Sequence, residues 1–314
     1  MAAFFNGVSA VIVLILLMSL GYILGLVGWI GPAEKKFISR FTINAAVPAN
    51  CIVSLLNNLD RDGLVHALVP LLSGTVSIGL TLLLGALVAK GMKLPQNRWG
   101  VFAAMVGTSN TTFVGLPVTI QIFGAAAVPN LMIYYLPSAT LLQTVAVMMI
   151  EASGSKEKKK LTLGVILKKI FTKAPIIGIC IGLTLLITGL YPPALVMTAM
   201  SYVSNTVVPL AMVYCGYVVY EVGLKNLRFY RGIPTMLVLR LAVSPLICLA
   251  VCSLLGVTGV YRGVFIVVSA LPVVSQIPVM SGEYGADETY AATGACLSML
   301  GCFLTIPILM ALLG

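Results

Sequence analysis

Gly107-Thr-Ser-Asn-Thr-Thr-Phe-Val-Gly-Leu-Pro117 is the stretch that decides how this chain folds. Glycine, proline and polar residues stand here in the middle of an apolar run that extends over residues 99–122. A proline removes a backbone donor and clashes with the carbonyl one turn earlier, so a helix over this run should break. We therefore predict two half-helices joined by irregular backbone.

A second apolar run carries a similar interruption, Ala270-Leu-Pro-Val-Val-Ser-Gln-Ile-Pro278. Irregular backbone at membrane depth is tolerated only where protein buries it or a watery cavity meets it. Broken helices also leave free N–H groups and a partial positive charge at their half-helix N-termini, which favour an anion such as a carboxylate. The interruptions thus predict an anion site, with helix breaks at Gly115, Pro117, Pro272 and Pro278.

A gapless shift of 161 residues relates these interruptions and much of the chain around them. The paired residues are Gly21 and Gly182, Gly28 and Gly189, Pro32-Ala33 and Pro193-Ala194, Asn44-x-x-Val47-Pro48 and Asn205-x-x-Val208-Pro209, Pro117-Val118 and Pro278-Val279, and Gly124-Ala125 and Gly285-Ala286. Internal similarity of this kind is typical of transporters built from two related halves.

The composition indicates that the bilayer is the solvent of this chain. Of 314 residues, 60% are hydrophobic and 9% charged, whereas a typical soluble domain is about 25% charged. Apolar runs recur that are long enough to cross a hydrocarbon core about 30 Å thick. We predict ten spans, at 8–30, 36–57, 65–89, 99–122, 127–150, 174–190, 194–219, 232–255, 262–282 and 289–313.

The predicted fold class is therefore an all-α polytopic membrane protein with two five-helix repeats, residues 1–150 and 174–314. Because each half holds an odd number of spans, the second half must enter the membrane with the opposite orientation. Residues 151–173 form a basic linker, and we interpret its amphipathic part, 161–172, as a surface helix and topological anchor. Binding of anionic lipid or of a partner protein is the alternative interpretation of this linker.

Lysine and arginine gather on one side of the predicted spans. The connections after spans 1, 3, 5 and 7 carry most of them, whereas the opposite side has only Arg61 and Arg262. Basic loops face the cytoplasm. We therefore expect a protein of the cell membrane whose linker lies in the cytoplasm and whose two termini lie outside the cell. The net charge of +10 is then a sign of topology, and we predict no binding of nucleic acid.

The residue types needed for an enzyme or a metal site are sparse. The single histidine is His66, with which no carboxylate clusters, and the seven cysteines form no C-x-x-C pair. No G-x-S-x-G, H-E-x-x-H or P-loop pattern occurs. We predict no catalytic residue, no metal and no other cofactor.

Polar side chains beside the interruptions are the candidate substrate ligands. They are Asn110, Thr111 and Thr112 in the fourth span, and Ser275 and Gln276 in the ninth.

Three further residues are candidates with an alternative role. Asn44 and Asn205 either line the same cavity or hydrogen-bond within kinks at the following Val-Pro pairs. Arg240 lies about 12 Å into the eighth span at 1.5 Å per residue. It is either a counter-charge for the anion or a structural residue that reaches the cytoplasmic surface or binds a carbonyl of the ninth span.

The run Asn110-Thr-Thr-Phe-Val-Gly-Leu-Pro117 resembles the N-T-G-F-x-G-x-P signature of the auxin efflux carrier family, which includes plant PIN proteins and prokaryotic carboxylate permeases. Ala270-Leu-Pro272 and the later Glu283-Tyr284-Gly285 resemble its ninth helix. The resemblance covers the whole chain and implies crossing broken helices 4 and 9. It also implies export or exchange of a small organic acid by an elevator-like movement of helices 3–5 and 8–10 against a scaffold of helices 1, 2, 6 and 7, and a homodimer formed through the scaffold.

Two departures from the family pattern bear on the substrate. Thr112 replaces the glycine of the signature, and Ser275-Gln276 stands where many relatives have an asparagine. The short linker resembles that of prokaryotic members of the family. Malate, malonate and other carboxylates are therefore all candidate substrates. A sodium-coupled symporter of the bile-acid type and a membrane sensor are the alternative functions, and coupling to protons or sodium is open too.

Overall fold

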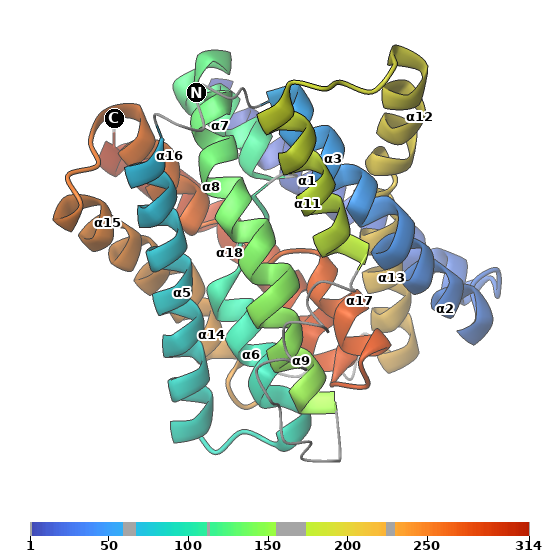
Figure 1. Ribbon diagram of the computed structural model, residues 1–314. Coiled ribbons are helices and arrows are strands. Elements are labelled where there is room, and N and C mark those ends of the chain that lie inside the picture. The colour runs from blue at the N-terminus through green and yellow to red at the C-terminus, as the bar shows by residue number, and fades with distance from the viewer. Residues whose placement is uncertain (1, 59–66, 112–113, 155–173, 224–229, 314) are drawn as a thin grey trace.

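The computed structural model describes residues 2–58, 67–111, 114–154, 174–223 and 230–313. These residues form a bundle of α-helices (Figure 1), with no β-structure among them beyond one isolated bridge. The helices are α1 (Ala2–Leu26), α2 (Pro32–Phe41), α3 (Val47–Asn58), α5 (Leu68–Gly91), α6 (Gln96–Gly107), α7 (Gly115–Phe123), α8 (Val128–Leu141), α9 (Val147–Gly154), α11 (Ala174–Thr188), α12 (Ala194–Asn205), α13 (Val207–Val222), α14 (Ile233–Val238), α15 (Ser244–Leu254), α16 (Gly259–Ser269), α17 (Gln276–Glu283) and α18 (Glu288–Leu313). Three π-helical turns, Thr42–Ala46, Leu142–Ala146 and Leu239–Val243, join α2 to α3, α8 to α9 and α14 to α15.

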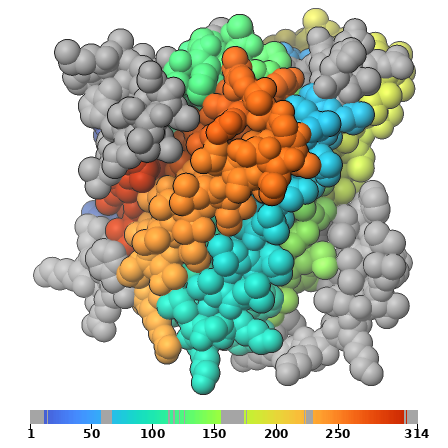
Figure 2. Space-filling view, turned by 90° about the vertical axis from the view of Figure 1, so that its left-hand side faces the viewer, coloured from blue at the N-terminus to red at the C-terminus, as the bar shows by residue number. Residues whose placement is uncertain are grey.

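Four continuous helical runs in the described part of the chain are long and apolar enough to cross a membrane. They are Leu68–Gly91, Val128–Gly154, Ala194–Glu221 and Ile233–Leu254. Large apolar side chains point outward from them, among them Leu83, Leu246 and Leu254, which are 53%, 62% and 85% exposed. Figure 2 shows α5 and α15 side by side on this outer face. An exposed apolar surface of this extent is stable only against lipid, so the protein is a multi-pass membrane protein.

Helix packing divides the bundle into two groups. In the first, here called the flanking group, α1 packs along α13, α3 packs on α11 and α12, and α2 leads into α3. In the second, called the crossing group, α6 packs on α5 and α9, α8 and α15 each pack on α5 and α16, and α17 packs on α18. Packing between the groups is less extensive than packing within them.

Glycines let the backbones approach closely inside each group. A Cβ atom added at Gly216 of α13 would lie 1.8 Å from the carbonyl oxygen of Met18 in α1. One added at Gly100 of α6 would lie 1.9 Å from the carbonyl oxygen of Met149 in α9. In lipid, helices associate mainly through close van der Waals packing at small residues, because the hydrophobic effect does not act between them. Close glycine contacts therefore stabilise the packing inside each group.

Several paired positions have matching backbone conformations. Gly28 and Gly189 both follow a helix with φ of 73° and 71°, and Gly124 and Gly285 do so with φ of 83° and 72°. A positive φ after a helix favours glycine because a Cβ atom is strained there. The members of each pair are related by the 161-residue shift, as are Gly115 and Gln276, where α7 and α17 begin.

Candidate functional site

Both interrupted runs are broken in the structure. The first run forms α6 and α7, which end at Gly107 and begin at Gly115, and the second forms α16 and α17, which end at Ser269 and begin at Gln276. Figure 1 shows α6 and α17 toward one end of the bundle and α7 and α16 toward the other. Pro272 lies inside the second break, while Pro117 and Pro278 each occupy the third position of the following half-helix. A proline is tolerated in a first helical turn because its missing N–H has no helical partner there.

The two breaks pair with each other. Ser109 and Val273 form an antiparallel bridge, and the backbone N–H of Asn110 donates to the carbonyl oxygen of Pro272 at 2.9 Å. Ser298 of α18 accepts the backbone N–H of Val273 at 3.1 Å. Backbone groups freed by the breaks therefore find partners inside the protein, as membrane depth requires.

Arg240 binds the carbonyl ends of both first half-helices. Its guanidinium donates to the carbonyl oxygens of Val106 in α6, at 2.8 Å, and of Leu271, at 3.1 Å, and also to that of Ser269 at the end of α16. The side chain is buried, at 1% exposure. A cation stabilises helix C-termini, where the partial charge is negative. Among the described residues, no carboxylate forms an ion pair with Arg240.

A pocket lies beside the paired breaks. Its lining residues are Val47, Asn50 and Cys51 from the flanking group, and Ser109, Asn110, Thr111, Tyr135, Ser138, Ala139, Leu142, Gln143, Val274 and Gln276 from the crossing group. The cavity volume is about 30 Å³, room for one or two water molecules. The site is thus small, carries polar side chains in a largely apolar wall, and lies at the boundary between the groups.

Asn110 has a buried side-chain amide without a hydrogen-bond partner. Neither its Nδ2 nor its Oδ1 is bonded, although the residue is only 1% exposed and lines the pocket. The hydroxyl of Ser275, which adjoins two lining residues, is likewise buried and unpartnered. Buried polar atoms are nearly always satisfied, so an unpartnered amide in a pocket wall is a candidate for contact with a bound molecule.

The predicted site residues divide by location. Asn110, Thr111 and Gln276 line the pocket, and Ser275 lies next to it in the chain. Arg240 lies on the carbonyls behind the breaks and is not among the lining residues.

Asn44, Asn205 and Thr112 complete the predicted set. Asn44 and Asn205 are exposed and outside the pocket, and the amide of Asn44 donates to the carbonyl oxygen of Arg40 at 2.9 Å. Thr112 falls outside the described residues.

Sequence reasoning missed five polar lining residues, Asn50, Ser109, Tyr135, Ser138 and Gln143. The amide of Gln143 donates to the Oε1 of Gln276 at 3.0 Å, and Asn50 accepts from Ser54 at 3.0 Å. Asn50 follows the Val-Pro pair that already marked a kink, and Ser138 follows Pro137. Proline followed closely by a polar residue within an apolar run is the signal that could have identified these two.

Comparison with known proteins agrees with this architecture. A family model described as membrane transport protein matches residues 7–310, nearly the whole chain. The chain belongs to this family, that of the auxin efflux carriers. Two relatives in the auxin efflux carrier family are uncharacterised transporters of archaea. One, from Methanothermobacter thermautotrophicus, is 26% identical over 97% of this chain and 98% of its own length, and the other, from Methanocaldococcus jannaschii, is 22% identical over 95% and 96%.

Membership of the auxin efflux carrier family identifies the general activity. The chain is a membrane transporter and not an enzyme. Its site is therefore a candidate for binding a transported substrate.

Proposed function

We propose that the protein is a secondary transporter of a small organic anion, a carboxylate, that binds in the pocket beside the paired breaks. The observation that carries this proposal is the unpartnered amide of Asn110 in the pocket wall. An amide offers both a donor and an acceptor, which suits a hydroxy or protonated group next to a carboxylate oxygen. Gln143, Gln276 and Ser138 add polar groups around it.

Local charge favours an anion over a cation. The half-helices α7 and α17 begin at Gly115 and Gln276, beside the pocket, and helix N-termini attract negative charge. Arg240 adds a full positive charge behind the breaks, and no described carboxylate neutralises it. In a low-dielectric interior this charge acts over a longer range than it would in water.

An elevator-type movement agrees with the position of the pocket. The flanking group supplies Val47, Asn50 and Cys51, and the crossing group supplies the other lining residues. A cavity of about 30 Å³ is too small for an organic acid, so binding needs the two groups to separate. We propose that the crossing group, corresponding to helices 3–5 and 8–10 of the family, moves against the flanking group as a scaffold.

We also propose that the chain spans the membrane ten times, as two five-helix halves of opposite orientation. The paired glycines with positive φ and the matching starts of α7 and α17 support it. The two chain ends lie toward the same end of the bundle (Figure 1), as an even number of spans requires. We place both termini outside the cell membrane and the linker in the cytoplasm, and propose a homodimer formed through the flanking group.

Uptake of labelled carboxylates into proteoliposomes tests the proposal. The panel includes malate and malonate, each with imposed proton or sodium gradients and with none. We expect saturable uptake of at least one carboxylate, inhibited by unlabelled substrate. A dependence of uptake on sodium would favour the bile-acid type of symporter. If no carboxylate of the panel is taken up and none raises the thermal stability of the protein, the proposed carrier function is wrong.

A further inference from the structure

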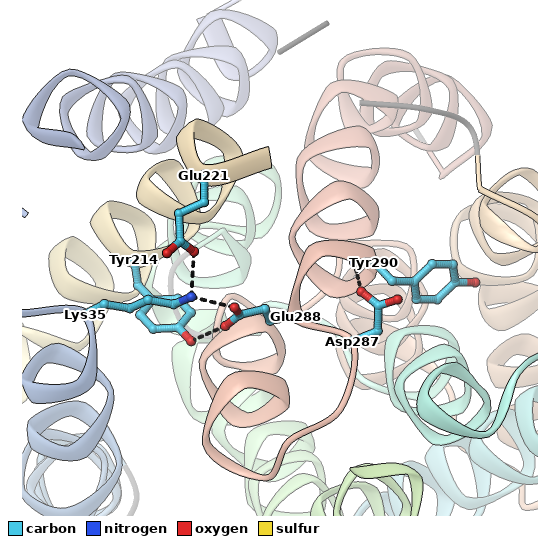
Figure 3. Close-up of polar contacts among 6 residues, drawn as sticks. All are labelled: Lys35, Tyr214, Glu221, Asp287, Glu288 and Tyr290. Carbon is cyan, nitrogen blue, oxygen red and sulfur yellow. Dashed lines mark hydrogen bonds and ion pairs between the residues drawn. The ribbon is translucent and has the colours of Figure 1, made fainter. Parts of the chain in front are cut away.

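An ion pair joins the two helix groups at the end of the bundle where α17 meets α18. The Nζ of Lys35, in α2 of the flanking group, lies 2.5 Å from Oε1 of Glu288, in the first turn of α18 of the crossing group. The same ammonium lies 2.6 Å from Oε2 of Glu221 in α13, within the flanking group. Figure 3 shows Lys35 between the two carboxylates. The side chain of Lys35 is 16% exposed and that of Glu288 26%, so the pair is partly removed from water.

Two hydrogen bonds accompany this ion pair across the boundary. Tyr214 of α13 donates to the other oxygen of Glu288, Oε2, at 2.8 Å. Ser39 of α2 donates to Oε2 of Glu283, the last residue of α17, at 3.1 Å. Since α17 begins at Gln276 in the pocket wall, this cluster is connected to the pocket by a single short helix.

The neighbouring acidic residue makes contacts of a different kind. Asp287 points away from Lys35 (Figure 3), and its Oδ2 lies 2.7 Å from the Nε of Arg98 in α6. Arg98 also lies over the rings of Tyr230 and Tyr290, with centroid distances of 4.7 and 5.3 Å. Asp287, Arg98 and Tyr290 all belong to the crossing group or its connections, so this pair stays intact when the groups move. Consecutive residues therefore hold the start of α18 to each group separately.

We infer that the Lys35–Glu288 ion pair, with the Tyr214 hydrogen bond, is a latch that holds the crossing group in the closed position. The latch rests on the proposed function, because it presumes that the crossing group moves. Movement of that group would separate Lys35 from Glu288 while Lys35 keeps Glu221 and so remains paired. The ammonium therefore has a partner in both positions, which lowers the cost of release.

The charge state of Lys35 suits this role. Burial acts to lower the pKa of Lys35, but the hydrogen bonds and charges of Glu221 and Glu288 outweigh it and raise that pKa above its ordinary value. Lys35 is thus charged at neutral pH.

Labelling of the native Cys51 thiol tests the latch without any substrate. Cys51 lines the pocket from the flanking group and is 2% exposed. The protein in lipid nanodiscs is treated with a water-soluble maleimide, and modified Cys51 is followed by peptide mass spectrometry. We expect Glu288→Gln and Lys35→Met each to speed this labelling about threefold or more, because loss of a partly exposed ion pair shifts an equilibrium by a factor of that order.

Two matched variants complete the experiment. Arg98→Gln removes the ion pair inside the crossing group, so labelling of Cys51 should stay within about twofold of wild type. Glu221→Gln removes the partner that Lys35 keeps after release, so it should slow the labelling. If Glu288→Gln does not fold, Tyr214→Phe replaces it, with a smaller increase expected. Unchanged labelling in the latch variants, or an equal increase in Arg98→Gln, would overturn the latch. Because no substrate is used, that failure is distinct from failure of the transport assay.

Discussion

Asn110 combines a stability cost with the binding role that we propose for it. A buried polar group without a partner costs roughly 1–3 kcal/mol, and both amide atoms of Asn110 are in this state. Its backbone is not strained, because Asn110 is not among the residues with positive φ. The side chain therefore destabilises the ligand-free protein, and a ligand bound as we propose would remove this cost.

Asn110→Leu should separate these two effects. Leucine has nearly the same shape without polar atoms, so we expect the apparent Tm of the ligand-free protein to rise by about 2–4 °C, and stabilisation by carboxylates to disappear. Thermal unfolding with and without substrate measures both. Asn50→Leu is the matched control, because Asn50 accepts a hydrogen bond from Ser54 and its loss should lower the Tm. A lower Tm in Asn110→Leu would contradict the unpartnered amide.

Arg240→Lys should impair the protein although the charge is retained. A lysine ammonium cannot reproduce the planar fork that reaches three carbonyls on two different breaks. Loss of even one hydrogen bond from a charged donor costs about 1.5–3 kcal/mol. We expect a clear drop in Tm and in substrate binding, whereas Arg231→Lys, at an exposed position, should behave as wild type. Equal stability of Arg240→Lys and wild type would show that the carbonyl contacts contribute little.

Local sequence predicted part of the site and not the rest. Asn110 and Gln276 could be identified because glycine and proline beside polar residues indicate a broken helix wherever they occur in an apolar run. The roles of Gln143 and Asn50 depend on which helices face the breaks, which is tertiary information. Arg240 was left with two roles because the carbonyls that it binds are brought together only when the breaks pair.

At the scale of elements, the sequence shows where the prolines stand but does not predict which helix irregularity accompanies each one. Pro48 and Pro245 each follow a π-helical turn, Thr42–Ala46 and Leu239–Val243, whereas Pro209 follows an interruption at Thr206 between α12 and α13. The missing N–H frees a carbonyl one turn earlier in every case. Packing against neighbouring helices determines whether the helix forms a π turn or an interruption near the proline. The sequence alone therefore predicts only that the helix is irregular there.

Close packing of α1 on α13 should make Gly216 intolerant of any side chain. Gly216→Ala would place a Cβ atom 1.8 Å from the Met18 carbonyl oxygen, and overpacking typically costs about 1–3 kcal/mol. We expect a lower Tm and poor recovery after heating. Gly79→Ala in α5 is the control, since a Cβ atom there has no neighbour within 4 Å and alanine favours a helix. If both variants have the same Tm, the close approach of α1 and α13 is wrong.

For the whole molecule, the structure combines two tightly packed groups with a small pocket between them. Polar residues of both groups line that pocket, and the cross-boundary contacts at its latch are made by the side chains of Lys35, Tyr214 and Ser39. Side-chain contacts can be exchanged without unfolding, whereas the glycine contacts inside each group cannot. This difference supports the alternating access that we propose, by movement of one group against the other.

Substrate counterflow in proteoliposomes tests the central claim most directly, because it requires both a binding site and its exposure to each side of the membrane. Wild-type protein and Asn110→Ala are reconstituted at equal density, loaded with an unlabelled carboxylate and diluted into the labelled one. We predict transient accumulation of label by the wild type and none by Asn110→Ala, with the variant still monodisperse and folded. Counterflow by Asn110→Ala at the wild-type rate would contradict a transport site at the paired breaks.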